Sequence, residues 1–248
     1  IIYCTQSPEY FLPTTACILQ HKLGLNTNCG AFDYNLGCSG YIYGLALAKS
    51  FINSGLATNV LIVTAEAYSK HLDADDVTNR AIFGDAATAT LIDKEAAFKI
   101  GEFNLGTDGS GAPNLIVPNG GAKTQFVNDC TKEGKLNMNG PEVFKFTLDN
   151  VPLSINDCLN KNKKEIKDID YFILHQANKY MLNNLRKKIV VEEERFFNDM
   201  MHTGNTVSNT IPIALEQSFK SSLIKAGDCV LLCGFGVGYS WGSTLLKF

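Results

Sequence analysis

Cys38 lies in the sequence Gly37-Cys38-Ser39-Gly40, between a short apolar run and a stretch whose apolar residues have helical spacing. This order predicts a thiol at the point where a strand ends and a helix begins. A helix N-terminus carries a partial positive charge and unpaired N–H groups, which favour thiolate over thiol and can also donate to an oxyanion. We therefore expect Cys38 to be a nucleophile, in a sharp turn that Gly37 and Gly40 permit.

Two further polar residues occupy comparable positions. His175 follows the apolar run 170–174, which is typical of a buried strand, and Asn205 follows Gly204 in a turn ahead of a helical stretch. Each residue alone would more often be structural, as an inert thiol, a hydrogen-bonded core histidine or a turn asparagine. In duplicated α/β sheets, however, the carboxyl ends of strands form a shared site. We expect Cys38, His175 and Asn205 to meet there.

The elements that must position these residues occur twice along the chain. The order strand, small-residue turn, helix, glycine, strand describes residues 31–65 and again 196–233. This order is typical of parallel strands covered by helices, hence of an α/β protein built from two related units. We place the first half at residues 1–97, with the cysteine, and the second at 98–248, with the histidine and asparagine.

Other segments give more local expectations. The run 59–65 predicts a strand buried on both faces, and 81–92, rich in small residues, a strand that packs closely on other backbone at Gly84. Residues 73–80 should be a polar loop and 234–238 a glycine-rich turn. Residues 98–138 suit an antiparallel excursion or a cover over a cleft. Pro152 should either kink or split a helix over 140–159.

Composition excludes several classes of protein. The 248 residues carry a net charge of −3, which argues against nucleic-acid binding. No apolar stretch is long enough to span a membrane. Eight cysteines in apolar contexts, without the spacing of a zinc site, indicate reduced thiols of a cytoplasmic protein and no metal. The chain opens in mid-strand without methionine, so we expect it to be the remainder of a longer protein.

Four motifs in order carry a resemblance to a known family. They are Gly37-Cys38-Ser39-Gly40, Leu174-His175-Gln176-Ala177-Asn178, Gly204-Asn205-Thr206 and Gly236-Val237-Gly238-Tyr239-Ser240-Trp241-Gly242, with Phe83-Gly84-Asp85 and Pro141-Glu142-Val143-Phe144-Lys145 between them. Together they resemble the β-ketoacyl-acyl-carrier-protein synthase III family of the thiolase superfamily. The resemblance implies a duplicated αβαβα fold, in which each half has a mixed sheet of the five-stranded type. The family's N-terminal part is missing from this chain.

The resemblance also implies a reaction. Cys38 would take an acyl group from acyl-CoA as a thioester, and His175 with Asn205 would hydrogen-bond the thioester carbonyl of malonyl-acyl-carrier protein during decarboxylation. The oxyanion hole would use the N–H of Cys38 and one from the turn Gly236-Val237-Gly238. No cofactor is implied, because acyl-CoA and malonyl-acyl-carrier protein are substrates. The partners are the carrier protein and, as a homodimer, a second copy of the chain.

Further residues receive roles from the same resemblance. Those expected at the acyl pocket are Phe11, Leu12 and Phe83; those expected at the CoA pantetheine are Arg80 and Asn178; and those expected to dock the carrier protein are Lys179, Arg186, Lys187 and Lys188. Arg80 could instead pair with a neighbouring aspartate, and the basic residues could form a solvated helix face. His71 and His202 are expected at the surface.

Three alternatives to condensation stay open at this point. A protein of the same fold could pass the acyl group from Cys38 to an alcohol or amine in specialised metabolism. It could also be a catalytically silent partner subunit, although such subunits typically lack the cysteine. A shortened, inactive fragment is the third alternative. CO₂ release that depends on a malonyl thioester separates the first alternative from condensation.

Overall fold

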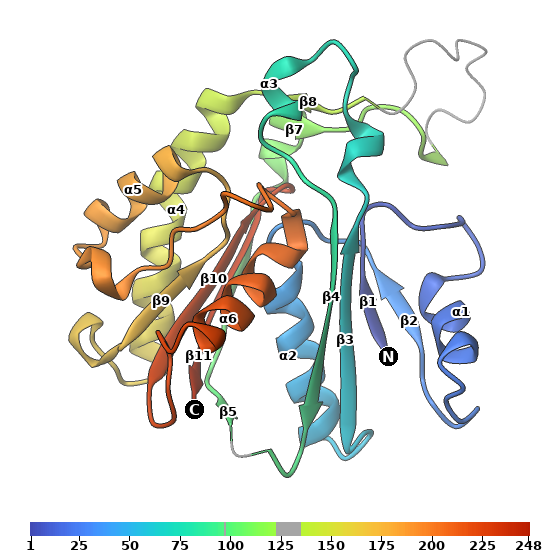
Figure 1. Cartoon of the computed structure of the whole chain (residues 1–248), viewed down its shortest axis with the longest axis horizontal. Coiled ribbons are helices and arrows are strands. Elements are labelled where there is room, and N and C mark those ends of the chain that lie inside the picture. Colours follow the sequence, from blue (N-terminus) through green and yellow to red (C-terminus); the bar gives the residue numbers. More distant parts are fainter. Residues whose placement is uncertain (97, 123–134) are drawn as a thin grey trace.

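Two large β-sheets form the frame of the protein in this computed structural model, which describes residues 1–96, 98–122 and 135–248 (Figure 1). The first sheet contains, in spatial order, β2 (Phe32–Tyr34), β1 (Ile2–Cys4), β3 (Asn59–Glu66) and β4 (Ala86–Asp93). The strands β1, β2 and β3 are parallel, and β4 runs antiparallel to β3.

The second sheet repeats this plan. Its strands are β9 (Tyr171–Leu174), β10 (Cys229–Gly236), β11 (Ser240–Lys247), β5 (Lys99–Ile100) and β6 (Asn104–Thr107). The parallel pair β9 and β10 is followed by antiparallel β11, which pairs with both β5 and β6. The predicted boundary after residue 97 lies between β4 and β5, which belong to different sheets, and residue 97 itself is outside the described residues.

Helices separate and cover the two sheets (Figure 1). The α-helices are α1 (Thr15–Lys22), α2 (Gly40–Asn53), α3 (Val77–Arg80), α4 (Gly140–Lys161), α5 (Lys179–Lys188) and α6 (Thr210–Lys220). Helices α2 and α6 contact strands of both sheets, whereas α4 contacts the second sheet and α5. The order of layers is therefore sheet, helices, sheet, helices, with α1 beside β2.

The second sheet is buried on both faces. Along β9, Phe172 and Leu174 join the core under α4 and α5, whereas Tyr171 and Ile173 join the core between the sheets. This alternation follows from the two-residue period of a strand. The strand β3 differs from the expectation, because every second side chain is buried and those between are only half-buried or exposed. Only one face of β3 lies against the layer of α2.

Three expectations about element boundaries need correction. The segment 73–80 is not all loop, because Asp76 accepts hydrogen bonds from the N–H groups of Thr78 and Asn79 and caps the short helix α3. The strand after Gly84 begins at residue 86. Helix α4 continues through Pro152, so the proposed split there is wrong.

The glycines at 234 and 236 belong to β10 rather than to a turn. Gly234 pairs with Gly242 on β11, and Gly236 pairs with Ser240. A Cβ on Gly234 would lie 2.8 Å from the carbonyl oxygen of Cys38. These glycines therefore let β10 pass directly beside the N-terminus of α2, and the turn itself follows Gly236.

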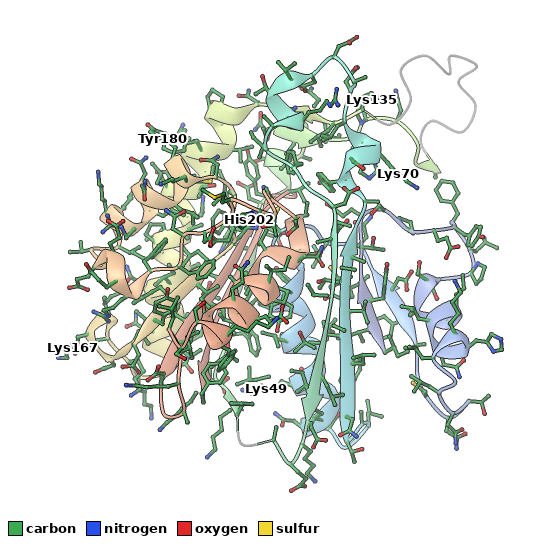
Figure 2. The ribbon with its side chains drawn as sticks, in the orientation of Figure 1. Lys49, Lys70, Lys135, Lys167, Tyr180 and His202 are labelled. Carbon is green, nitrogen blue, oxygen red and sulfur yellow. The ribbon has the colours of Figure 1, made fainter. Side chains whose placement is uncertain are left out.

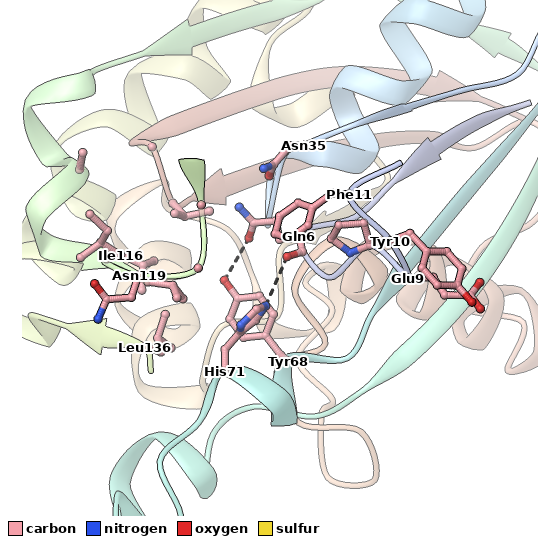
Figure 3. A pocket seen from close by; sticks show the side chains of 18 residues that line it. Gln6, Glu9, Tyr10, Phe11, Asn35, Tyr68, His71, Ile116, Asn119 and Leu136 are labelled. Carbon is pink, nitrogen blue, oxygen red and sulfur yellow. Dashed lines mark hydrogen bonds between the residues drawn. The ribbon is translucent and has the colours of Figure 1, made fainter. Parts of the chain in front are cut away.

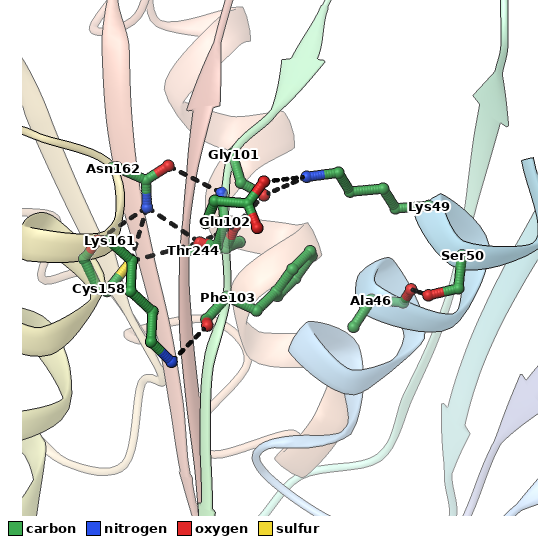
Figure 4. Close-up of polar contacts among 10 residues, drawn as sticks. All are labelled: Ala46, Lys49, Ser50, Gly101, Glu102, Phe103, Cys158, Lys161, Asn162 and Thr244. Atoms are coloured by element: carbon green, nitrogen blue, oxygen red, sulfur yellow. Dashed lines mark hydrogen bonds and ion pairs between the residues drawn. The ribbon is translucent and has the colours of Figure 1, made fainter. Parts of the chain in front are cut away.

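Residues 98–122 form the predicted antiparallel excursion. A polar network fixes its residues 101–103 between two helices (Figure 4). Lys49 of α2 donates to the Gly101 carbonyl at 2.9 Å, and Asn162, after α4, bonds both backbone groups of Glu102 at 2.8 and 3.0 Å. Farther along, β7 (Leu115–Ile116) pairs with β8 (Asn137–Met138). Residues 123–134 of the predicted cover lie outside the described residues.

Other expectations concern the whole chain. The seven cysteines that the structure describes are free thiols, and Cys130 lies outside the described residues. Within that described part, no three His, Cys, Asp or Glu side chains gather as metal ligands. No helix there is both long and apolar enough to cross a membrane.

Candidate active site

Cys38 stands directly before Ser39, the N-cap residue of α2, and only 7% of the cysteine is exposed. The backbone N–H groups of Cys38 itself and of Val237 lower the pKa of its thiol. A Cβ on Gly236 would lie 2.9 Å from both Cβ and Sγ of Cys38. The absence of a side chain at Gly236 therefore makes room for the sulfur.

The protonation state of Cys38 differs from the sequence-based expectation. Burial raises the pKa of the Cys38 thiol to about 12, with a smaller contribution from Glu66, while the amides of Cys38 and Val237 lower it. Desolvation disfavours the charged form of a buried acid. The helix N-terminus was visible in the sequence, but the depth of burial was not. In the closed site the resting group is a neutral thiol.

His175 follows β9 directly and is 2% exposed. Its Nδ1 lies 2.7 Å from Oγ1 of Thr210, and that hydroxyl also donates to the Val207 carbonyl at 3.2 Å. The Thr210 hydroxyl can pair with either tautomer of the His175 ring. It accepts from a protonated Nδ1 when its own proton points to the Val207 carbonyl, and it donates to Nδ1 when that nitrogen is unprotonated. Burial lowers the pKa of His175 to about 3. The ring is therefore neutral near pH 7, and Nε2 is its nitrogen that remains for a substrate.

Asn205 is held by three hydrogen bonds. Its Oδ1 accepts from the Val207 N–H at 2.9 Å, its N–H donates to the Ile82 carbonyl at 2.8 Å, and its carbonyl accepts from the Gly84 N–H at 3.0 Å. The first bond fixes the orientation of the side-chain amide. It leaves the Nδ2 group, a hydrogen-bond donor, for the cavity that Asn205 lines.

One small cavity of about 50 Å³ joins these groups. The sequence-predicted residues that line it are Cys38, Phe83, His175, Asn178, Asn205 and Gly236. The structure thus brings together a thiol, an imidazole and an amide from three distant segments. Such a set can form a thioester at sulfur and donate hydrogen bonds to an oxygen that becomes negative.

Comparisons with known proteins agree with this geometry. The family models "3-Oxoacyl-[acyl-carrier-protein (ACP)] synthase III" and its "C terminal" counterpart match residues 32–109 and 159–248. A β-ketoacyl-[acyl-carrier-protein] synthase III of Clostridium perfringens is 39% identical over 251 residues, covering 100% of this chain and 76% of the relative. The chain belongs to the 3-oxoacyl-[acyl-carrier-protein] synthase III family.

Solved structures of this family have the same fold. A 3-oxoacyl-(acyl-carrier-protein) synthase III matches with a TM-score of 0.95 and 46% identity, over 100% of this chain and 77% of that one. The enzyme of Thermus thermophilus matches with a TM-score of 0.90 and 34% identity, over 100% and 76%. The predicted family, thiolase-like fold and acyltransferase class are confirmed. Members act in fatty-acid biosynthesis on acyl-CoA and malonyl-acyl-carrier protein without a cofactor.

Other residues that the family resemblance singled out line a different cavity or none. Phe11, Val237 and Gly238 line a second, larger cavity of about 830 Å³ (Figure 3). Leu12 lines neither cavity in the described chain and is 82% exposed, as Phe11 is at 80%. Their role at an acyl pocket stays a prediction.

Arg80 lines a separate hollow of about 340 Å³, whose wall it shares with Phe83. Its guanidinium donates to the Ala74 carbonyl at 2.5 Å. The aspartates suggested as ion-pair partners are engaged otherwise, since Asp76 caps α3 and Asp85 accepts from Ser69. The ion-pair interpretation is therefore wrong for the described contacts, and the pantetheine role stays a prediction.

The basic residues of α5 divide into two kinds. Lys179 and Lys187 are exposed, and Lys188 lies 3.9 Å from Asp149 across the solvent-facing surface. Arg186 has a side chain only 19% exposed and donates to the Val191 carbonyl at 3.0 Å. Arg186 therefore holds the end of its own helix, which argues against a docking role for it.

Sequence reasoning missed two groups near the site. Glu66, at the end of β3, accepts hydrogen bonds from the Gln6 N–H and the Ser208 hydroxyl, each at 3.0 Å. It thereby joins the loop after β1 to the loop after Asn205. The signal for Glu66 that the sequence offered was an acidic residue at the end of an apolar strand. His71, expected at the surface, is half-buried and lines the larger cavity, whereas His202 is exposed (Figure 2).

Proposed function

We propose that this chain condenses an acyl group from acyl-CoA with malonyl-acyl-carrier protein, with Cys38 as the acyl carrier. The observation that carries the assignment of roles is the shared cavity. Cys38, His175 and Asn205 line it together, and the backbone amides of Cys38 and Val237 favour the charged form of the sulfur.

In the first step, Sγ of Cys38 attacks the thioester carbonyl of acyl-CoA. A bond forms between sulfur and the carbonyl carbon, the bond to the CoA sulfur breaks, and the thiol proton ends on the released CoA. The N–H groups of Cys38 and Val237 would stabilise the tetrahedral oxyanion. Because the product is a neutral thioester, a buried site that disfavours thiolate also favours this product.

In the second step, the malonyl carboxylate leaves as CO₂ and an enolate attacks the acyl-cysteine. Nε2 of His175 and Nδ2 of Asn205 would hydrogen-bond the thioester oxygen where the enolate charge develops. Donors that act on charge present only near the transition state accelerate the step itself. Collapse of the adduct returns the sulfur of Cys38, which regains a proton.

The partners follow from the reaction and the surface. The carrier protein would approach the exposed lysines of α5, and a second copy of the chain would complete a homodimer. The exposed side chains of Phe11 and Leu12 support such a contact between copies. The free thiols of the described cysteines support a cytoplasmic location.

Intact-mass analysis tests the assignment. Acetyl-CoA should add one acetyl group to the wild-type chain and none to Cys38→Ala. His175→Ala and Asn205→Ala should still become acylated, but each should lose about 10²–10³-fold in CO₂ release from malonyl-acyl-carrier protein. A wild-type chain that no acyl-CoA acylates would contradict the proposal, as would transfer of the acyl group from Cys38 to an alcohol or amine acceptor without a malonyl thioester.

A further inference from the structure

The cavity at Cys38 and the larger cavity share a wall. Tyr68 and Leu115 line both of them, and no other residue does so among the described parts of the chain. The small cavity measures about 50 Å³ and the large one about 830 Å³. A cavity needs a volume of roughly 10–15 Å³ to hold one water molecule. The space at the sulfur therefore holds only a few heavy atoms, as in an acetyl or propionyl group.

Tyr68 is held firmly in this wall (Figure 3). It is 4% exposed and begins the short 3-10 helix Tyr68–His71 that follows β3. Its hydroxyl donates to Oε1 of Gln6 at 3.0 Å. The ring of His71 packs edge-on against it with centroids 5.5 Å apart, and His71 Nε2 lies 3.3 Å from the Gln6 carbonyl.

The other side of the Tyr68 ring faces the reaction site. The ring lies 5.0 Å from that of Phe83, which also lines the cavity at Cys38. Burial, together with the neighbouring Cys38 and Glu66, raises the pKa of Tyr68, so its hydroxyl stays protonated. A neutral aromatic ring thus closes the small cavity on the side of the large one.

We propose that Tyr68, anchored by Gln6, limits the length of the acyl group that Cys38 accepts. The inference rests on the proposed function, because it assigns the small cavity to the acyl group. Removing the ring would join the two cavities and offer a longer chain the apolar walls of the larger one, including Leu115, Ile116 and Leu136.

The test measures single-turnover acylation by acetyl-, butyryl- and octanoyl-CoA, followed by intact mass. Wild type should prefer acetyl- over octanoyl-CoA by at least about 100-fold, since a long chain has no space at the sulfur. In Tyr68→Ala this preference should fall at least about tenfold, because octanoylation should gain relative to acetylation. Leu115→Ala opens the same wall without touching Tyr68, and it should shift the preference in the same direction.

Further variants separate the explanations. Tyr68→Phe keeps the ring and should keep most of the preference even if Tyr68→Ala folds poorly. Tyr180→Ala removes an exposed tyrosine on α5 and should change nothing (Figure 2). An unchanged preference for acetyl-CoA in both Tyr68→Ala and Leu115→Ala would overturn the inference. An equal increase in the acylation rate with all three acyl-CoAs would also overturn it, because it would indicate that Tyr68 restricts access to Cys38 and not the length of the acyl group. A wild-type chain without any adduct would instead refute the proposed function.

Discussion

Replacing Gly236 by alanine should move the nucleophile. The new Cβ would lie 2.9 Å from Cβ and Sγ of Cys38. Carbon atoms pack at about 3.5 Å, so the two groups must separate by about 0.6 Å. Sγ can rotate away, but Cβ of Cys38 can move only with its backbone at the start of α2. Overpacking of this kind costs about 1–3 kcal/mol of stability.

The functional cost should exceed the structural one. A misplacement of about 1 Å can slow a reaction about 100-fold, so we expect acetylation of Cys38 to slow by about 10- to 100-fold in Gly236→Ala. Rapid-quench acetylation by acetyl-CoA measures this rate, and urea unfolding measures the stability. Gly30→Ala is the matched control, because nothing lies within 4 Å of its Cβ position. A Gly236→Ala variant that is acetylated at the wild-type rate would refute the reasoning.

Three further predictions concern charge. Because burial raises the pKa of Cys38 to about 12, its alkylation by iodoacetamide, followed by peptide mass, should rise about tenfold per pH unit from 7 to 9; a plateau below pH 8 would contradict this. Burial raises the pKa of Glu66 from 4.5 to about 7, so its stabilising contribution of about 3 kcal/mol is complete below pH 4.5 and is lost as the pH rises through 7. Unfolding of wild type and Glu66→Gln by urea at pH 5 and 8 should show this loss in wild type alone. Reversing Lys179 and Lys187 to glutamate should raise KM for the carrier protein about three- to tenfold at low salt and leave KM for acetyl-CoA unchanged; an unchanged carrier KM would remove the docking role.

The proposed catalytic groups could be found in the sequence because they are chemically rare residues at the ends of elements. Cys38, His175 and Asn205 each follow a strand or a turn that local pattern identifies, and parallel topology then places them together. Local pattern also predicted most of the helices. The possible split of the helix at Pro152 was wrong, because a long helix that packs on a sheet can accommodate one proline.

Other properties depend on contacts between distant segments. The hydroxyl of Tyr68 is held by Gln6, 62 residues earlier in the chain, and the hydroxyl of Thr210 contacts His175, 35 residues earlier. Neither partner leaves a periodic signal in the chain. The pKa of Cys38 likewise depends on how deeply three segments bury the thiol, and the size of a cavity depends on every wall at once.

The backbone of Asn205 is paired with the first half of the chain on both sides, through Ile82 and Gly84. A side chain on Gly84 would collide with the Thr203 carbonyl, so this crossing depends on glycine. The two halves therefore cannot part without withdrawing the amide of Asn205 from the cavity. The proposed reaction site is therefore complete only while the two halves are docked. The amide protons of Gly84 and Asn205 should then exchange with solvent at a common rate.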